Sequence, residues 1–345
     1  MDLRDESTRL RVRTCREESV TEDLQHVGVD RSRLLPELRR MLEIADALGL
    51  SPPESMSAIE ARAASEIRLA GHWGAKDDVD AVETFAIPSR GETIRLRLYR
   101  KTGTARTILY FHGGGWVVGS LDTHDGALRA LVHAAGANIV AVEYAKAPEH
   151  PFPACLDDAL SALDWLLANA QAAGLDAERI IVAGDSAGAS IAASLAVLAR
   201  DRGTPLLGQV LVYPATDLTA MTPSRTAFAQ GYFLSMPTMD WYVAHYLSGG
   251  TDPADPGVSP LRADDLANLP AALLVTADHD PLRDEGRAYA GRLIAAGNNV
   301  AYEEWRGTVH GFMIMDRTTR ASRKLIEQVG GWCRRLWEGS DNGSC

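Results

Sequence analysis

The chain has 345 residues, with 35 Lys and Arg against 46 Asp and Glu, so its net charge is −11 at pH 7. This acidic balance argues against a protein that binds nucleic acid or anionic membranes. The four cysteines form no CxxC pair, so their spacing suggests neither a zinc site nor a disulfide framework. The sequence shows neither a secretory signal nor an apolar run long enough to span a membrane, so we expect a cytoplasmic protein.

The first part of the chain has two different sections. Residues 1–33 are polar and carry interspersed charges, and we predict that they form an extension. Residues 34–47 show the apolar spacing of an amphipathic helix. A second helix begins at the capping box formed by Ser57 and Glu60. Both helices precede the first strand, so we assign residues 34–80 to the N-terminal part of a cap.

A regular alternation of apolar runs and helical stretches follows. This pattern is typical of a mostly parallel sheet with helices on both faces, and we predict an α/β fold with an eight-stranded sheet over 81–216 and 270–338. Strands are predicted, the first two antiparallel, at 82–87, 94–99, 107–111, 138–144, 179–184, 209–213, 271–277 and 300–305. Helices are predicted at 124–135, 154–172, 187–201, 282–296 and 318–337.

One long segment interrupts this alternation. Residues 217–269 separate two predicted strands and contain a helix predicted over 238–247 between loops rich in Pro and Asp. Insertions of this size in α/β domains are often functional. We therefore predict that 217–269 completes the helical cap, above the carboxyl ends of the strands where α/β sheets bind ligands.

The most specific motif is Gly184-Asp-Ser186-Ala-Gly188. It follows a buried-strand pattern and precedes a helix of small residues, which is the context of a G-x-S-x-G nucleophile elbow. Its glycines relieve crowding at a tight strand-to-helix turn. The turn exposes the Ser186 hydroxyl, and the helix N-terminus favours negative charge that develops beside it.

A glycine-rich segment, His112-Gly113-Gly114-Gly115-Trp116, comes directly after a predicted strand. Successive glycines expose backbone N–H groups to a ligand. An HGGG segment upstream of the elbow is the oxyanion-loop arrangement of lipases and esterases. We interpret His112 as a structural anchor of this loop rather than as a proton carrier.

A serine nucleophile needs a base, and the base needs a carboxylate that orients it. In this fold the three residues follow in the chain order serine, acid, histidine. Three histidines come after the serine: His245, His279 and His310. His310 follows the last predicted strand in a loop flanked by glycine, where the base is expected. His245 lies in the predicted cap helix, and His279 lies between two aspartates and remains a competitor.

The acid is expected just after the strand predicted at 271–277. Four carboxylates follow this strand: Asp278, Asp280, Asp284 and Glu285. The last two belong to the start of a helix, a common structural use of acids. Asp280 precedes Pro281 in the strand-to-helix loop and is our choice, with Asp278 as the alternative.

Several motifs occur in the order of one known family. Together they resemble the hormone-sensitive lipase family of α/β-hydrolases, and among these the bacterial esterases with a GDSAG elbow. The matching segments are HGGGWVVGSLDTHD (112–125), EYAKAPEHPFPA (143–154), AGDSAG (183–188), YPATD (213–217), GYFLS (231–235), VSPLRA (258–263), DPLRDEG (280–286) and HGF (310–312).

The resemblance implies a serine carboxylesterase with the triad Ser186, Asp280 and His310, acting on short-to-medium acyl esters without metal or organic cofactor. It also implies oxyanion donors and aromatic residues that border the pocket. The donors would be the backbone N–H groups of Gly114, Gly115 and Ala187, with Gly113 shaping the loop. The aromatic residues would be Trp116, Tyr232, Phe233 and Trp241.

Other functions use the same residues. An amidase, a formamidase or a lactonase has the same triad and differs in leaving group and pocket shape. A non-catalytic ligand-binding protein on this scaffold typically lacks a triad or oxyanion residue, and all of them are present here. The expected partner is a small-molecule ester, with a homodimer possible through the strand at 300–305.

Overall fold

A computed structural model describes residues 29–341, and the helices and strands all belong to one compact unit that begins at Arg31. Most of the predicted polar extension, residues 1–28, lies outside the described residues. No helix in the part of the chain that the structure describes is both long and apolar enough to cross a membrane.

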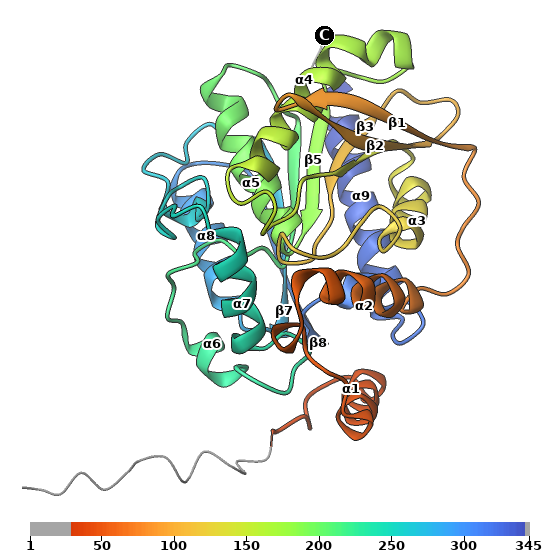
Figure 1. The fold of residues 1–345 in the computed structure, drawn as a ribbon. Coiled ribbons are helices and arrows are strands. Elements are labelled where there is room, and N and C mark those ends of the chain that lie inside the picture. The colour runs from red at the N-terminus through yellow and green to blue at the C-terminus, as the bar shows by residue number, and fades with distance from the viewer. Residues whose placement is uncertain (1–28, 342–345) are drawn as a thin grey trace, which may run out of the picture. The chain divides into compact units, whose positions relative to one another are not determined.

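The eight strands form one sheet in the order β1-β2-β4-β3-β5-β6-β7-β8 (Figure 1). β2 pairs antiparallel with both β1 and β4, and all other neighbours are parallel, as the apolar runs predicted. The strands are Ala81–Ser89 (β1), Glu92–Arg100 (β2), Thr107–Phe111 (β3), Asn138–Glu143 (β4), Ile180–Asp185 (β5), Gly208–Val212 (β6), Ala271–His279 (β7) and Val300–Val309 (β8).

Helices cover both faces of the sheet because alternate side chains of its strands point to opposite faces. In β3, Leu109 and Phe111 join the apolar cluster beneath α4, α5 and α8, whereas Ile108 and Tyr110 join the cluster beneath α3 and α9 (Figure 1). These helices are Asp125–Ala135 (α3), Ala154–Ala173 (α4), Ala187–Asp201 (α5), Arg283–Ala295 (α8) and Ala321–Asp341 (α9).

The remaining elements named here belong to the N-terminal segment and the insertion. They are Pro36–Leu48 (α1), Pro53–Ser55 (η1), Ala58–Gly71 (α2), Pro223–Ala227 (α6), Met236–Tyr246 (α7) and Pro260–Arg262 (η2). Ser57 and Glu60 form both hydrogen bonds of the predicted capping box. α7 begins two residues before its predicted start, because the Ser235 hydroxyl caps it by accepting from the Thr238 amide.

The structure does not test the predicted pairing of two chains at the edge of the sheet. β8 is the last strand in the order, so its outer side has no neighbour within the described sheet. Pairing of two chains at this edge stays a prediction, as does the division of the compact unit into a catalytic domain and a cap. Light scattering measures the first directly.

Candidate active site

Ser186 lies at a sharp turn between β5 and α5, at the carboxyl end of the parallel strands. Its backbone has φ 54° and ψ −124°, a strained conformation for a residue other than glycine. The turn is tight because a Cβ atom at Gly188 would lie 2.1 Å from the Phe111 carbonyl oxygen. The Ser186 amide donates to the Val212 carbonyl at 2.8 Å, which fixes the elbow against β6.

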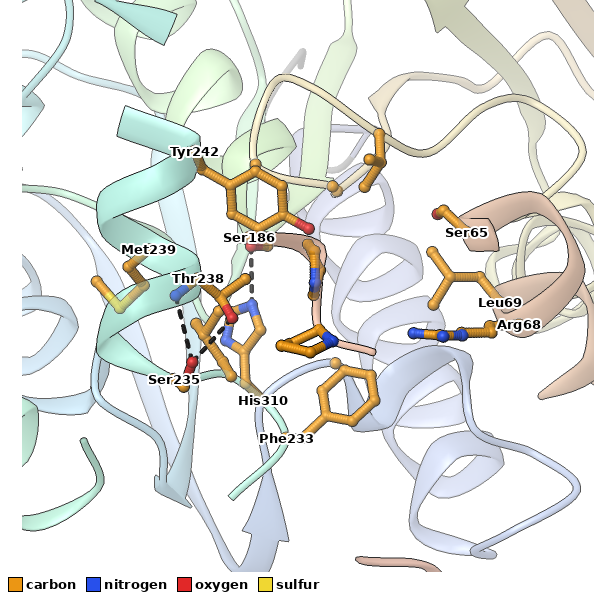
Figure 2. Close-up of a pocket in the computed structure, with 18 of the residues that line it drawn as sticks. Ser65, Arg68, Leu69, Ser186, Phe233, Ser235, Thr238, Met239, Tyr242 and His310 are labelled. Carbon is orange, nitrogen blue, oxygen red and sulfur yellow. Dashed lines mark hydrogen bonds between the residues drawn. The ribbon is translucent and has the colours of Figure 1, made fainter. Parts of the chain in front are cut away.

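The structure brings together the three side chains predicted from loops far apart in the sequence. His310 follows β8, and its Nε2 lies 2.8 Å from the Ser186 Oγ. Its Nδ1 lies 2.7 Å from an Asp280 carboxylate oxygen, in the loop after β7. The carboxylate accepts from Nδ1–H, which leaves Nε2 to accept the hydroxyl proton. Figure 2 shows the contact between His310 and Ser186. Asp280 is fully buried and His310 is buried.

The competing residues have other partners. Asp278 accepts from the His279 ring at 2.6 Å and from the Thr308 amide at 3.2 Å. The ring of His245 packs edge-on against Trp241. None of these groups contacts Ser186 or His310 in the described hydrogen bonds.

The two acids of α8 support the start of the insertion and the residue just before it. Asp284 accepts from the Ser224 amide at 2.9 Å. Glu285 accepts from the Thr216 amide at 2.8 Å and pairs with Arg225 at 2.7 Å. Burial raises the pKa of Glu285 to about 7, although Arg225 opposes this effect. Both acids therefore have the structural use that their position predicted.

The glycine loop after β3 presents backbone donors toward the elbow. The Gly113 amide donates to the Asp185 carboxylate at 3.0 Å. The amides of Gly114 and Gly115 donate to no acceptor within residues 29–341. Ala187 opens α5, so its amide has no acceptor in a preceding helical turn. A side chain does not fit at Gly115, which has φ +58° and where a Cβ atom would lie 2.2 Å from the Tyr242 ring.

Asp185 holds this loop in place, a role that sequence reasoning missed. It is buried and accepts from the Tyr110 hydroxyl at 2.8 Å in addition to the Gly113 amide. The His124 ring lies 3.2 Å from the same carboxylate. Burial alone raises the pKa of Asp185, but His124 and the hydrogen bond from Tyr110 outweigh it and lower the pKa. A carboxylate at the variable position before the nucleophile was the available signal.

His112 anchors the loop from its other side. Its ring stacks on Tyr144 at 4.4 Å, and its Nδ1 lies 2.8 Å from the Gly113 carbonyl oxygen. Burial lowers the pKa of His112 to about 3, and nearby Lys146 adds to this effect. The ring is therefore neutral at ordinary pH, and it does not contact Ser186 in the described hydrogen bonds.

A cavity of about 810 Å³ opens above Ser186 (Figure 2). Its walls come from the glycine loop, the N-terminal helices and the insertion, and most of them are apolar. Of the four predicted aromatic residues, Trp116 and Phe233 line the cavity. Tyr232 lies outside the lining and packs against Phe228 and His279. Trp241 also lies outside it, packed against the Tyr242 ring.

These residues have the chemistry of acyl transfer. A hydroxyl hydrogen-bonded to an imidazole, which a buried carboxylate orients, is the general arrangement of an activated serine nucleophile. Free backbone amides beside that hydroxyl are suited to hold a negatively charged oxygen. The cavity has the size of a small-molecule site.

Comparisons with known proteins agree with this geometry. A family model described as alpha/beta hydrolase fold matches residues 108–314. The chain is 38% identical over 296 residues to ethyl acetate hydrolase of Pseudomonas putida, covering 82% of this chain and 92% of that protein. It is 38% identical over 302 residues to the carboxylic ester hydrolase LipN of Mycobacterium tuberculosis, covering 83% and 79%. A solved ester-hydrolase from the metagenome of Lake Arreo superposes with a TM-score of 0.86 at 38% identity, covering 88% and 99%.

Proposed function

The chain belongs to the hormone-sensitive-lipase-like family of α/β hydrolases and is a carboxylic ester hydrolase, and we propose that Ser186, His310 and Asp280 are its catalytic triad. The observation that carries this assignment is the continuous chain of contacts from the Ser186 Oγ through both ring nitrogens of His310 to Asp280, at 2.8 and 2.7 Å.

The reaction begins when the Ser186 Oγ attacks the ester carbonyl carbon. The His310 Nε2 accepts the hydroxyl proton as the new carbon–oxygen bond forms. Asp280 keeps the imidazole in the tautomer that can accept this proton, and its charge stabilises the imidazolium that results. The imidazolium then donates its proton to the leaving alkoxide, and an acyl-serine remains.

The second half of the reaction repeats these roles with water. His310 removes a proton from a water molecule, whose oxygen attacks the acyl carbon. The bond between this carbon and the Ser186 Oγ then breaks, the imidazolium returns its proton to Oγ, and the carboxylic acid leaves. In both halves the carbonyl oxygen becomes negatively charged, and the amides of Gly114, Gly115 and Ala187 are the proposed donors to it. Gly113 is not among them, because its amide already donates to Asp185. Loss of one such donor typically costs on the order of 3 kcal/mol of transition-state stabilisation.

We propose short-to-medium acyl esters as substrates. The mostly apolar cavity of about 810 Å³ offers room for such chains. Trp116 and Phe233 border it and are proposed to contact the substrate. Trp241 packs behind Tyr242, which lines the cavity, and Tyr232 lies outside the lining.

The test is a panel of p-nitrophenyl esters from acetyl to lauroyl, hydrolysed by the wild type and by Ser186→Ala. We expect the highest kcat/KM on acyl chains at the short-to-medium end and loss of hydrolysis in the variant. Circular dichroism of the variant controls for folding. Hydrolysis that persists in a folded Ser186→Ala protein would overturn the assignment of the nucleophile.

A further inference from the structure

One wall of the cavity carries polar side chains that have little to bind within the protein. Ser65, Arg68 and His72 follow each other at helical spacing along the end of α2, and all three line the cavity. Figure 2 shows Ser65 and Arg68 on the side of the cavity that lies across from α7, with Ser186 and His310 between the two sides. The wall around them is mostly apolar.

The Ser65 hydroxyl has no hydrogen-bond partner in the described part of the chain, although the residue is only 8% exposed. A buried hydroxyl without a partner is costly, so a site that keeps one is expected to satisfy it with a water or a ligand. Figure 2 shows this oxygen turned toward the cavity. The His72 ring packs edge-on against Phe233 at the same wall.

Arg68 is the cation of this wall that has no counter-ion among the described residues. Its guanidinium donates one hydrogen bond, to the Ser51 carbonyl oxygen at 3.0 Å, and the residue as a whole is partly buried. The other charged residues that line the cavity have partners. Arg31 pairs with Asp46 at 2.6 Å, and Asp185 is held by the donors beneath the glycine loop. Within residues 29–341, no carboxylate pairs with Arg68.

From this arrangement we propose that the preferred esters carry a carboxylate group on the acyl chain, which Arg68 binds at the α2 wall with help from the Ser65 hydroxyl. The planar guanidinium presents parallel N–H donors that match the two oxygens of a carboxylate. The half-buried wall strengthens this attraction relative to open solvent. The apolar remainder of the cavity accommodates the methylene chain between the carboxylate and the ester. This inference rests on the proposed function, since it places the ester at Ser186.

The experiment compares two ethyl esters that differ only at the end of the acyl chain. Monoethyl adipate carries a carboxylate where ethyl hexanoate carries a methyl group, and acid release by both is followed by titration at constant pH. We expect Arg68→Gln to lower kcat/KM for the anionic ester about tenfold more than for the neutral ester, because a charge-assisted hydrogen bond is lost. The effect should appear chiefly in KM, and Arg68→Lys should restore part of it.

Two controls separate this result from loss of folding and from general electrostatics. Arg40→Gln removes an exposed cation of α1 that does not line the cavity. We expect this variant to leave the ratio of kcat/KM for the anionic ester to kcat/KM for the neutral ester unchanged. Arg68→Glu should lower the ratio further than Arg68→Gln does. Equal changes for both esters in Arg68→Gln would overturn the carboxylate site while leaving the esterase assignment intact. Failure of the wild type to hydrolyse either ester, together with no acylation of Ser186, would instead overturn the proposed function.

Discussion

The loops at the carboxyl end of the sheet and the wall formed by α2 both border the cavity, but they treat their polar groups differently. Beneath the glycine loop, the Asp185 carboxylate is bonded to the Gly113 amide and the Tyr110 hydroxyl and lies beside His124. On α2, the Ser65 hydroxyl has no partner among the described residues, and Arg68 has no carboxylate. Groups that must not move are tied to the protein, whereas groups that face a ligand are left to bind it. Substitutions in the loops should therefore change turnover of every ester, and substitutions in the walls should change which ester is preferred.

The largest effect is expected from the acid that orients the base. Asp280→Asn should lower kcat by about 10⁴-fold for all esters, because the amide favours the wrong imidazole tautomer. Asp278→Asn is the matched control. Asp278 lies two residues before Asp280, and its carboxylate contacts the His279 ring instead of His310. Steady-state kinetics on one short and one medium ester measures both. A large loss in Asp278→Asn with little loss in Asp280→Asn would show that the alternative from the sequence, Asp278, was the correct acid.

Substitution of Asp185 tests the role of the hydrogen bonds beneath the glycine loop, where Asp185 acts as a positioning residue. Asp185→Asn should lower kcat by about 100-fold with a smaller change in KM, because the glycine loop loses its anchor. It should also reduce the free energy of unfolding by about 3 kcal/mol. Asp158→Asn is a suitable control. Asp158 is fully buried and pairs with Arg90 at 2.8 Å, away from the cavity, so it should cost stability and spare kcat. Similar kcat losses in both variants would contradict the proposal that Asp185 positions the glycine loop.

His112 should make the loop sensitive to acid. In the unfolded chain the imidazole binds a proton with its ordinary pKa of 6.5, whereas the folded protein holds the pKa at about 3. Between these values the unfolded state binds more protons, so stability is present above pH 6.5 and is lost as the pH falls. The loss from this residue should reach up to about 1.4 kcal/mol for each pH unit.

Urea unfolding at several pH values measures this loss. Glu285, whose raised pKa of about 7 acts with the opposite sign, is present in both proteins and cancels when the wild type is compared with His112→Gln. The variant should show the shallower decline of stability toward acid. Parallel pH profiles would contradict burial of a neutral ring at this position.

The smallest effect is expected at the cavity wall. Phe233 lines the cavity and remains 43% exposed, so its truncation should cost little stability. Phe233→Ala should lower kcat/KM for an octanoyl ester about fivefold relative to a butyryl ester, because the longer chain loses an apolar contact. A p-nitrophenyl ester series measures this ratio. An equal fall in kcat for both esters would show that Phe233 affects turnover in general, as the loop residues do, and not the choice of acyl chain.

Much of this architecture could be predicted from local patterns. Apolar runs located all eight strands, and the Ser57–Glu60 capping box located the start of α2, because these signals depend on near neighbours in the chain. The nucleophile elbow and the loop after β8 could likewise be located from the glycines in their own sequences. The chain order of the fold then placed His310 and Asp280 beside Ser186.

The remaining features depend on contacts between distant segments. The sequence shows Asp185 only as the variable position of the elbow motif, and its partners Tyr110 and His124 come from other elements. Tyr232 and Trp241 were predicted to border the pocket, but aromatic character does not reveal which side of a loop or helix faces the cavity. That Arg68 has no carboxylate partner among the described residues likewise becomes visible only in the folded chain.

The most direct test of the catalytic assignment is to identify the residue that an organophosphate modifies. We predict one adduct for each chain by intact mass, assigned to Ser186 by peptide mapping, and no adduct in Ser186→Ala. Prior incubation with a rapidly hydrolysed ester should slow the modification. An adduct on any other residue, or one that persists in Ser186→Ala, would contradict the central claim that Ser186 is the nucleophile.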